Sequence, residues 1–329
     1  MTEGSRARLN NFDLLRFLLA GTVVLFHAAV LSGSGPLRAA LRFANGHYAV
    51  LGFFAISGYV VSLSWQRLQS APEFFQRRAR RVLPGYLAVV LFCWAAGGAV
   101  STLPLLDYWT NGETWRYLLA NLSFLQFLAP TLPGVFQSNP VMAAVNGSLW
   151  SIRAELFCYL LMPLLAVWWR PAGLLACCLV TALWLVQWEA KPLWVTQTKI
   201  GIVDPIACFA VGVLMTRAKA RRLACWGCAG AIVLAFSSTF SPLTLLEPMA
   251  VAAIVLAAAV SLPFLGNWPM LGNLSYGMYL WHFPLIQWLG GAGWASRSPW
   301  LFLAATIGGT LALAMLSWHL VEKRFLART

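Results

Sequence analysis

Charged residues are scarce in this chain, since only 10% of its 329 residues are Asp, Glu, Lys or Arg. Soluble domains carry about a quarter of such residues. Hydrophobic residues instead make up 60% of the sequence. This shortage argues against a soluble protein and indicates lipid as the solvent. No segment is long and polar enough to form a separate soluble domain, so we expect a single membrane domain over residues 1–329.

Acidic residues are fewer than basic ones, with 10 Asp and Glu against 23 Lys and Arg, and the net charge is +13. In a soluble protein this surplus would suggest nucleic acid as a partner. Cytoplasmic loops of membrane proteins also collect Lys and Arg, however, and this is the better explanation for an apolar chain. We therefore expect contact with membrane lipids and no nucleic-acid partner.

Apolar stretches of the length that crosses a bilayer, about 20 residues, cover most of the chain. They predict an all-α, polytopic fold of about ten transmembrane helices. With both termini placed in the cytoplasm, most Lys and Arg residues fall on the inner side, which supports this threading. The predicted spans are 13–32, 48–66, 84–101, 147–169, 172–188, 200–216, 224–240, 247–265, 271–290 and 299–321.

The longest segment between predicted spans, residues 102–146, is expected to face outward. A loop of this length in a compact protein is usually functional or contains short helices of its own. Its part 113–128 could lie in the membrane interface as an amphipathic helix.

Cysteine and histidine are both few. The seven Cys are an odd number and lie almost entirely in apolar runs, which argues against a disulfide framework. The four His are scattered, with no pair at the i, i+4 spacing of a metal site. We expect no metal cofactor.

Ionisable side chains at membrane depth are costly and are therefore functional candidates. His27 is either a partner in an interhelical hydrogen bond or a neutral base that accepts a hydroxyl proton. Glu155 is expected at a similar depth, where its carboxylate could orient His27. Arg16 lies roughly 16 Å from His27 along the helix axis, toward the inner end. Arg153 and His282 are the other ionisable groups inside predicted spans.

Three further groups have two explanations each. Arg77, Arg78, Arg80 and Arg81 precede Pro84 on the predicted inner face. They either anchor the chain to lipid headgroups or bind the phosphates of a nucleotide-bearing donor. The small residues around Ser57 indicate close helix packing, or Ser57 donates a hydrogen bond in a site. The polar cluster Ser275–His282 lines a cavity with either a structural or a functional role.

Five motifs stand in order along the chain. They are Asp13-Leu14-Leu15-Arg16 followed by ten residues and His27; Phe53-Phe54-Ala55-Ile56-Ser57-Gly58; Arg77-Arg78-Ala79-Arg80-Arg81-Val82-Leu83-Pro84; Ser148-Leu149-Trp150-Ser151-Ile152-Arg153-Ala154-Glu155-Leu156-Phe157-Cys158-Tyr159; and Ser275-Tyr276-Gly277-Met278-Tyr279-Leu280-Trp281-His282. With them the chain resembles the acyltransferase-3 family of membrane acyltransferases over nearly its whole length.

Two departures from the family pattern concern the arginines. The arginine motif has one extra residue, so both Arg77/Arg80 and Arg78/Arg81 fit the family's Arg-x-x-Arg frame, and the position of Pro84 favours the second. Arg324 stands where the family often has proline. The chain also lacks the soluble hydrolase-like domain of some relatives, so transfer must be completed within the membrane domain.

The resemblance implies an O-acyltransferase in a bacterial inner membrane. Its donor would be cytoplasmic acetyl-CoA or another acyl-CoA, and its acceptor a glycan hydroxyl, on a lipid-linked or exopolysaccharide sugar. Polysaccharide-synthesis proteins are expected partners. Acylation of a small molecule such as a macrolide is an alternative.

The hypothesis assigns roles to residues of these motifs. The catalytic residues are His27 and Glu155; the coenzyme A ligands are Arg16, Arg77, Arg78, Arg81 and Ser57; the acceptor ligands are Trp150, Arg153, Tyr279 and His282. A transporter that moves an acyl group or solute without chemistry is the rival class, against which the lack of internal repeats argues. A scaffold for a polysaccharide-synthesis complex is a third, and it would not need His27 and Glu155 at matching depth.

Overall fold

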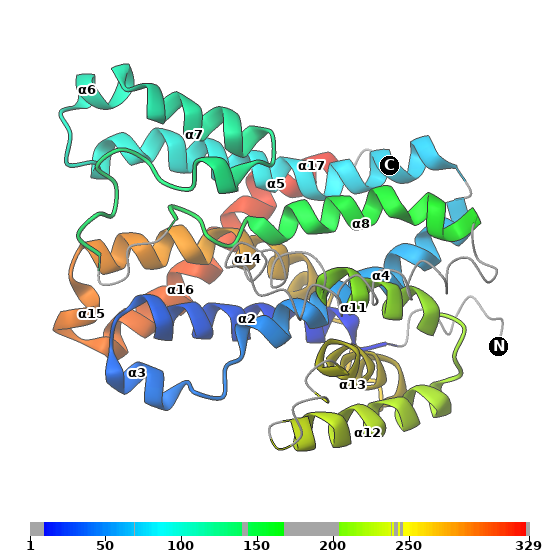
Figure 1. Cartoon of the computed structure of the whole chain (residues 1–329). Coiled ribbons are helices and arrows are strands. Elements are labelled where there is room, and N and C mark those ends of the chain that lie inside the picture. The colour runs from blue at the N-terminus through cyan, green and yellow to red at the C-terminus, as the bar shows by residue number, and fades with distance from the viewer. Residues whose placement is uncertain are drawn as a thin grey trace. The chain divides into compact units, whose positions relative to one another are not determined.

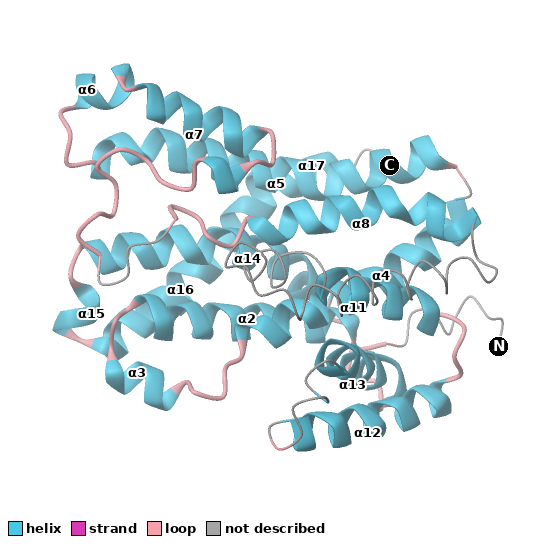
Figure 2. Ribbon diagram, viewed as in Figure 1, coloured by secondary structure: helices cyan, strands magenta, loops and turns pink. Residues whose placement is uncertain are grey.

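The computed structural model consists of helices and connecting loops, and its described part contains no strand (Figure 2). This agrees with the predicted all-α fold. The structure describes residues 10–68, 70–139, 144–167, 204–237, 239, 243 and 246–326.

Figure 1 shows the described helices, coloured in chain order. They are α2 (Phe12–Leu31), α3 (Gly35–Ala40), α4 (Gly46–Leu68), α5 (Ala71–Val100), α6 (Leu105–Thr110), α7 (Gly112–Leu122), α8 (Trp150–Val167), α11 (Asp204–Met215), α12 (Ala220–Ser237), α13 (Glu247–Ser261), α14 (Pro269–Gly291), α15 (Trp294–Arg297), α16 (Pro299–Ser317) and α17 (Lys323–Leu326). A 3-10 turn spans Gln126–Leu128, and a π-helical turn at Trp318–Glu322 joins α16 to α17.

The chain forms two compact units, each assembled from three segments. Unit 1 contains the described residues of Met1–Leu19, His47–Gln76 and Arg153–Pro269; unit 2 contains those of Ala20–Gly46, Arg77–Ile152 and Met270–Thr329.

Five described helical stretches are long and apolar enough to cross a membrane: Phe12–Leu31, Gly46–Leu68, Ala71–Val100, Ala220–Ser237 and Pro299–Leu326. The helices α11 and α13 are apolar but shorter. Every predicted span overlaps one described helix, except 172–188, which lies outside the described residues. The chain is therefore a helical membrane protein, while the count of ten spans and the cytoplasmic termini stay predictions.

Helix α5 extends well beyond the start of the third predicted span. It begins at Ala71 and has 30 residues, so the arginine motif and Pro84 lie inside the helix. Proline has no N–H to donate to the carbonyl one turn earlier, which here belongs to Arg80. The helix nevertheless continues, and α14 packs closely against it here: a Cβ on Gly85 would lie 2.9 Å from the Tyr276 ring.

The core of unit 2 forms between α2, α14 and α16. Ala28 and Leu31 of α2 pack against Phe283 and Ile286 of α14 and Phe302 of α16, and all five side chains are buried. This apolar cluster adjoins His27 in the sequence of α2 and His282 in that of α14. It fixes the two helices against each other at the level of these histidines.

Unit 1 contains a close crossing of α4 and α11. A Cβ on Gly58 would lie 2.0 Å from the Phe209 carbonyl oxygen, and one on Gly212 would lie 2.2 Å from the Ala55 carbonyl oxygen. Only glycine allows backbones to approach this closely. The predicted packing role of the second-helix motif is therefore confirmed at Gly58, and this packing positions the neighbouring Ser57.

Residues 102–146 contain short helices, as their length predicted. Helices α6 and α7 are fixed to α5 by aromatic packing, since the Trp94 ring lies 5.0 Å from Trp109 and 5.2 Å from Trp115. The Tyr108 hydroxyl donates to the Trp94 carbonyl at 2.7 Å. Burial, with a smaller electrostatic contribution from Cys93, raises the pKa of Tyr108 to about 12, so this phenol stays a neutral donor.

Candidate active site

A pair of histidines lies at the centre of the candidate site in unit 2. His27 Nδ1 and His282 Nε2 are 3.0 Å apart, which is hydrogen-bonding distance. His27 belongs to α2 and His282 to α14, and the two residues are 255 positions apart in the sequence. The sequence had placed both histidines inside the membrane, but it gave no indication that they touch.

The hydrogen bonds of the pair fix its protons. His282 Nδ1 lies 3.0 Å from the Met278 carbonyl oxygen, which can only accept. Nδ1 of His282 therefore donates, and in the neutral ring Nε2 must accept. The donor to it is His27 Nδ1–H, which leaves the lone pair of neutral His27 on Nε2. His27 thus has the tautomer of a base, and its partner holds that tautomer in place.

The surroundings of the pair are apolar and aromatic. His282 is fully buried, whereas His27 is partly exposed. The Phe283 ring lies 5.2 Å from the His27 ring, at its edge. The Tyr279 ring lies 5.9 Å from His282. A partly exposed base beside a fully buried partner can receive a proton from a bound molecule without moving the partner.

A polar network ties the segment before α8 to α14. The Tyr279 hydroxyl lies 2.7 Å from Ser151 Oγ and donates to the Ser148 carbonyl at 3.1 Å. The Ser148 hydroxyl donates to Asn146 Oδ1 at 2.6 Å. The predicted acceptor ligand Tyr279 is thus part of a buried framework, and it joins two motifs that lie far apart in the sequence.

Pro284 explains why Asn146 is needed in this network. Proline inside α14 cannot donate to the carbonyl of Leu280, four residues earlier. Asn146 Nδ2 donates to that carbonyl at 2.9 Å. The side chain replaces the missing helical hydrogen bond, and the loop is held against the helix as a result.

Arg81 of the arginine motif is held by aromatic rings. Its guanidinium lies 5.9 Å from the ring centres of both Tyr276 and Trp318, and it donates to Asn273 Oδ1 at 3.4 Å. A cation over the face of an aromatic ring is attracted by the ring's negative face. The structure thus gives Arg81 a fixed position between α14 and the π-helical turn.

Glu322 lies beside this arginine and was given no role from the sequence. It is 1% exposed, interacts electrostatically with Arg81 and accepts a hydrogen bond from Ser317 Oγ at 2.8 Å. Its Oε2 is buried and has no hydrogen-bond partner among the described residues. Sequence reasoning missed this residue because only its position near a helix end was visible.

The other arginines of the motif differ in exposure. Arg77 is exposed and Arg78 is partly buried. Arg78 Nε is buried and makes no hydrogen bond within the part of the chain that the structure describes. Such a donor is available to an acceptor that binds there, such as a phosphate oxygen.

Glu155 belongs to unit 1, where two hydroxyls serve it. Ser57 Oγ donates to Glu155 Oε1 at 3.4 Å, and the Tyr159 hydroxyl donates to the same oxygen. The predicted residues Ser57 and Glu155 are therefore neighbours. His27 lies in unit 2, and the predicted pairing of Glu155 with His27 stays a prediction.

Three further predicted residues lie on the same helices. Arg16 of α2 has Asp13 Oδ1 at 4.0 Å, one turn earlier. Trp150 begins α8 and is partly buried, and Arg153, one turn later, is partly buried as well. Their predicted roles toward donor and acceptor stay predictions.

Comparison with known proteins connects this arrangement to a family. The acyltransferase domain family matches residues 9–319. No solved structure matches the chain.

Three curated relatives match nearly end to end. Nodulation protein 10 of Rhizobium leguminosarum bv. viciae is 30% identical over 98% of this chain and 94% of its own length. The O-acetyl transferase of Shigella phage Sf6 is 25% identical, with 97% of each chain covered. Exopolysaccharide production protein ExoZ of Rhizobium meliloti is 29% identical over 93% of this chain and 95% of its own. The chain therefore belongs to the acyltransferase-3 family of membrane acyltransferases.

Proposed function

We propose that this protein transfers an acetyl or similar short acyl group from cytoplasmic acyl-CoA to a glycan hydroxyl. The observation that carries the proposal is the hydrogen bond between His27 Nδ1 and His282 Nε2, at 3.0 Å. It leaves the basic nitrogen of a partly exposed histidine ready to accept a proton. A scaffold has no need of such a base, whereas a proton-coupled transporter also uses intramembrane histidines. Consumption of acyl-CoA therefore distinguishes the enzyme from the transporter.

The reaction follows from this tautomer. The acceptor hydroxyl oxygen attacks the thioester carbonyl carbon, while His27 Nε2 takes the hydroxyl proton. The new C–O bond forms and the C–S bond breaks, and the coenzyme A thiolate leaves. The proton on His27 then returns to the thiolate, which restores the neutral ring. A general base in this position contributes about 10² to 10⁴-fold to the rate.

His282 has a positioning role in this proposal. Both of its ring nitrogens are already engaged, with Met278 and with His27. It holds the His27 ring and accepts the Nδ1–H hydrogen bond that strengthens when His27 becomes charged. We therefore propose that His282 positions His27 and does not contact the acceptor directly.

The donor would be bound at the arginine motif. Guanidinium groups pair with phosphate oxygens in a bidentate manner, and coenzyme A carries several phosphates. Arg78 has a buried donor nitrogen with no hydrogen bond in the described residues, and Arg81 is held in place by Tyr276 and Trp318. Arg77 is exposed nearby and would join them. Arg16, at the inner end of α2, and Ser57 are further proposed ligands of the donor, and Ser57 could contact it through its oxygen because its hydroxyl hydrogen is directed to Glu155.

The acceptor class is suggested by the relatives. Two of them are named for O-acetyl transfer and for exopolysaccharide production. A lipid-linked or exopolysaccharide sugar is the acceptor we propose, with Trp150, Arg153 and Tyr279 as the residues near it. The setting would be a bacterial inner membrane, with polysaccharide-synthesis proteins as partners. Glu155, which belongs to the fourth motif, would act either on His27 or on the acceptor.

The test is release of coenzyme A from acetyl-CoA by the purified protein in nanodiscs, with a glycan acceptor present. His27→Ala should lower the rate by about 10² to 10⁴-fold. The matched control is His319→Ala, because His319 is exposed and its Nδ1 contacts only its own helix, at the Met315 carbonyl. Substantial turnover by His27→Ala would refute the base assignment. Solute movement without release of coenzyme A would favour the transporter reading.

A further inference from the structure

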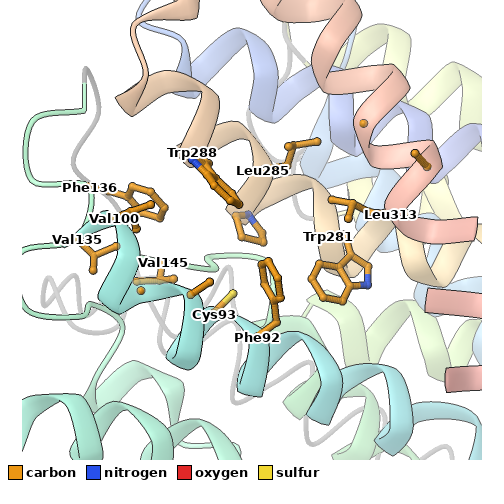
Figure 3. Close-up of a pocket in the computed structure, with 15 residues that line it drawn as sticks. Phe92, Cys93, Val100, Val135, Phe136, Val145, Trp281, Leu285, Trp288 and Leu313 are labelled. Atoms are coloured by element: carbon orange, nitrogen blue, oxygen red, sulfur yellow. The ribbon is translucent and has the colours of Figure 1, made fainter. Parts of the chain in front are cut away.

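An apolar pocket of about 290 Å³ lies within unit 2, between residues of α5, α14 and α16 and of the segment that follows α7. Figure 3 shows its walls, with Phe92 and Cys93 of α5 facing Trp281 and Trp288 of α14. Alanine and glycine residues among the lining leave room for the pocket. The remaining lining residues are Ala96, Gly97, Val100, Val135, Phe136, Val145, Pro284, Leu285, Gly309, Ala312 and Leu313.

The walls determine what can occupy the pocket. No lining residue is charged, and the lining side chains are hydrocarbon, aromatic or a thiol. A water molecule needs two to four polar partners, so apolar cavities stay dry. A hydrocarbon chain needs none and gains dispersion contacts on every side.

The rim of the pocket is where a membrane lipid would enter. Phe92 is 41% exposed and Trp288 is 48% exposed. Both belong to helices that we place in the membrane, so their exposed faces meet lipid. With the predicted threading, the end of α5 at Val100 points outward, which puts the pocket in the outer half of the bilayer.

The neighbours of the pocket connect it to the site. Trp281 of its wall directly precedes His282 in α14, and Val145 directly precedes Asn146 of the polar network. Trp150, which we assign to the acceptor, follows five positions after Val145. A molecule with its tail in the pocket would therefore have its polar end near the loop that leads to Trp150.

We infer that this pocket holds the hydrocarbon tail of the acceptor, which is an amphiphile with a lipid-linked sugar and not a free soluble glycan. The inference rests on the proposed function for the identity of the occupant. A bulk phospholipid is the alternative source of the same chemistry, and the experiment must separate the two.

The experiment uses the full chain in nanodiscs and a polyprenyl-phosphate sugar that carries a diazirine on its tail. We expect crosslinks on the pocket residues of α5 and α14, reduced by an excess of the unlabelled polyprenyl lipid. Ala96→Leu should lower the yield about tenfold, because it removes room for about two methylenes. Ala95→Leu is the matched control, since Ala95 is exposed and does not line the pocket. Ala312→Phe fills the same pocket from α16 if Ala96→Leu fails to fold.

Two readouts decide the result. A diazirine phospholipid that labels the pocket equally, with no competition by the polyprenyl lipid, would overturn the inference. Equal labelling of Ala95→Leu and both filled variants would do so too. In transfer assays, Ala96→Leu should raise the KM for the lipid-linked sugar, whereas Ala95→Leu, outside the pocket, should leave it unchanged. If the wild type shows no transfer to the lipid-linked sugar but the pocket is labelled specifically, the proposed function fails and the tail site stands.

Discussion

At the scale of single residues, the central feature is which ring nitrogen of His27 carries the proton. The Met278 carbonyl can only accept, so it assigns the proton on His282 Nδ1, and this in turn assigns the proton on His27 Nδ1. In the proposed mechanism a second histidine orients His27, while the predicted pairing of His27 with Glu155 stays a prediction. A neutral partner stabilises the charged His27 ring less than a carboxylate would, but it keeps charge out of a buried, apolar part of the molecule.

The arginine motif gives a prediction at the same scale. A double variant, Arg78→Ala with Arg81→Ala, should lose coenzyme A binding, because both guanidinium groups that pair with the phosphates are removed. Calorimetric titration of coenzyme A into the protein in nanodiscs measures this. We expect the double variant to bind coenzyme A at least about 100-fold more weakly than the wild type.

Arg324→Ala is the control for that titration, since it removes an exposed arginine of α17 that we give no role. Undiminished binding by the double variant would place the donor phosphates elsewhere. Binding lost equally in Arg324→Ala would show a general effect of positive charge.

At the scale of helices, the α4–α11 crossing depends on glycine. Gly58→Ala would put a methyl group on the Phe209 carbonyl, because the Cβ position lies 2.0 Å from that oxygen. We expect a loss of about 1–3 kcal/mol in stability, with a lower melting temperature in detergent. The control is Gly21→Ala, because a Cβ there meets nothing within 4 Å. Alanine at that helical site should instead stabilise by about 0.5–1 kcal/mol. Equal melting of the two variants would contradict the crossing.

The loop contact at α14 gives a second prediction for this scale. Asn146→Ala should destabilise by about 1–3 kcal/mol, because the Leu280 carbonyl loses its donor. Pro284→Ala restores an N–H at the position that normally serves this carbonyl. In the Pro284→Ala background, Asn146→Ala should therefore cost about 0.5–1.5 kcal/mol less. Denaturation of all four proteins measures the coupling, and additive losses would show that Asn146 acts by another route.

The sequence predicted helices better than it predicted contacts. Hydropathy placed helices where the structure has them, because a bilayer demands long apolar stretches. The predicted third span starts at Pro84, whereas the helix that contains it begins earlier, at Ala71. Within this helix, Gly85 packs against Tyr276 of α14, where a Cβ would lie 2.9 Å from the ring. This contact is tertiary and leaves no local pattern.

The site shows the same division. The residue types at His27 and His282 marked both as functional candidates, but their pairing joins segments 255 positions apart. No spacing rule can show such a pair. Pro284 is the one local signal that could have pointed to Asn146, because a proline inside a helix always leaves a carbonyl in need of a donor.

At the scale of the whole molecule, the predicted threading puts both termini in the cytoplasm. Fusions to the C-terminus test it directly. We expect green fluorescent protein to fluoresce there and alkaline phosphatase to be inactive, because the C-terminus is predicted to lie in the cytoplasm. A fusion after Thr110, in the segment predicted to face outward, should give the opposite pair of results. An active phosphatase at the C-terminus would contradict the cytoplasmic placement of that end.

The most direct test of the account is whether the two histidines act as one unit. The transfer rate should be measured for the wild type, His27→Ala, His282→Phe and the double variant. We predict that His282→Phe loses about 10 to 100-fold in kcat, as do residues that orient a reacting group. His282→Gln, which keeps an acceptor for His27 Nδ1, should recover part of that loss. The double variant should be no slower than His27→Ala alone, because a partner has nothing to orient once the base is gone. Losses that multiply in the double variant would contradict the account.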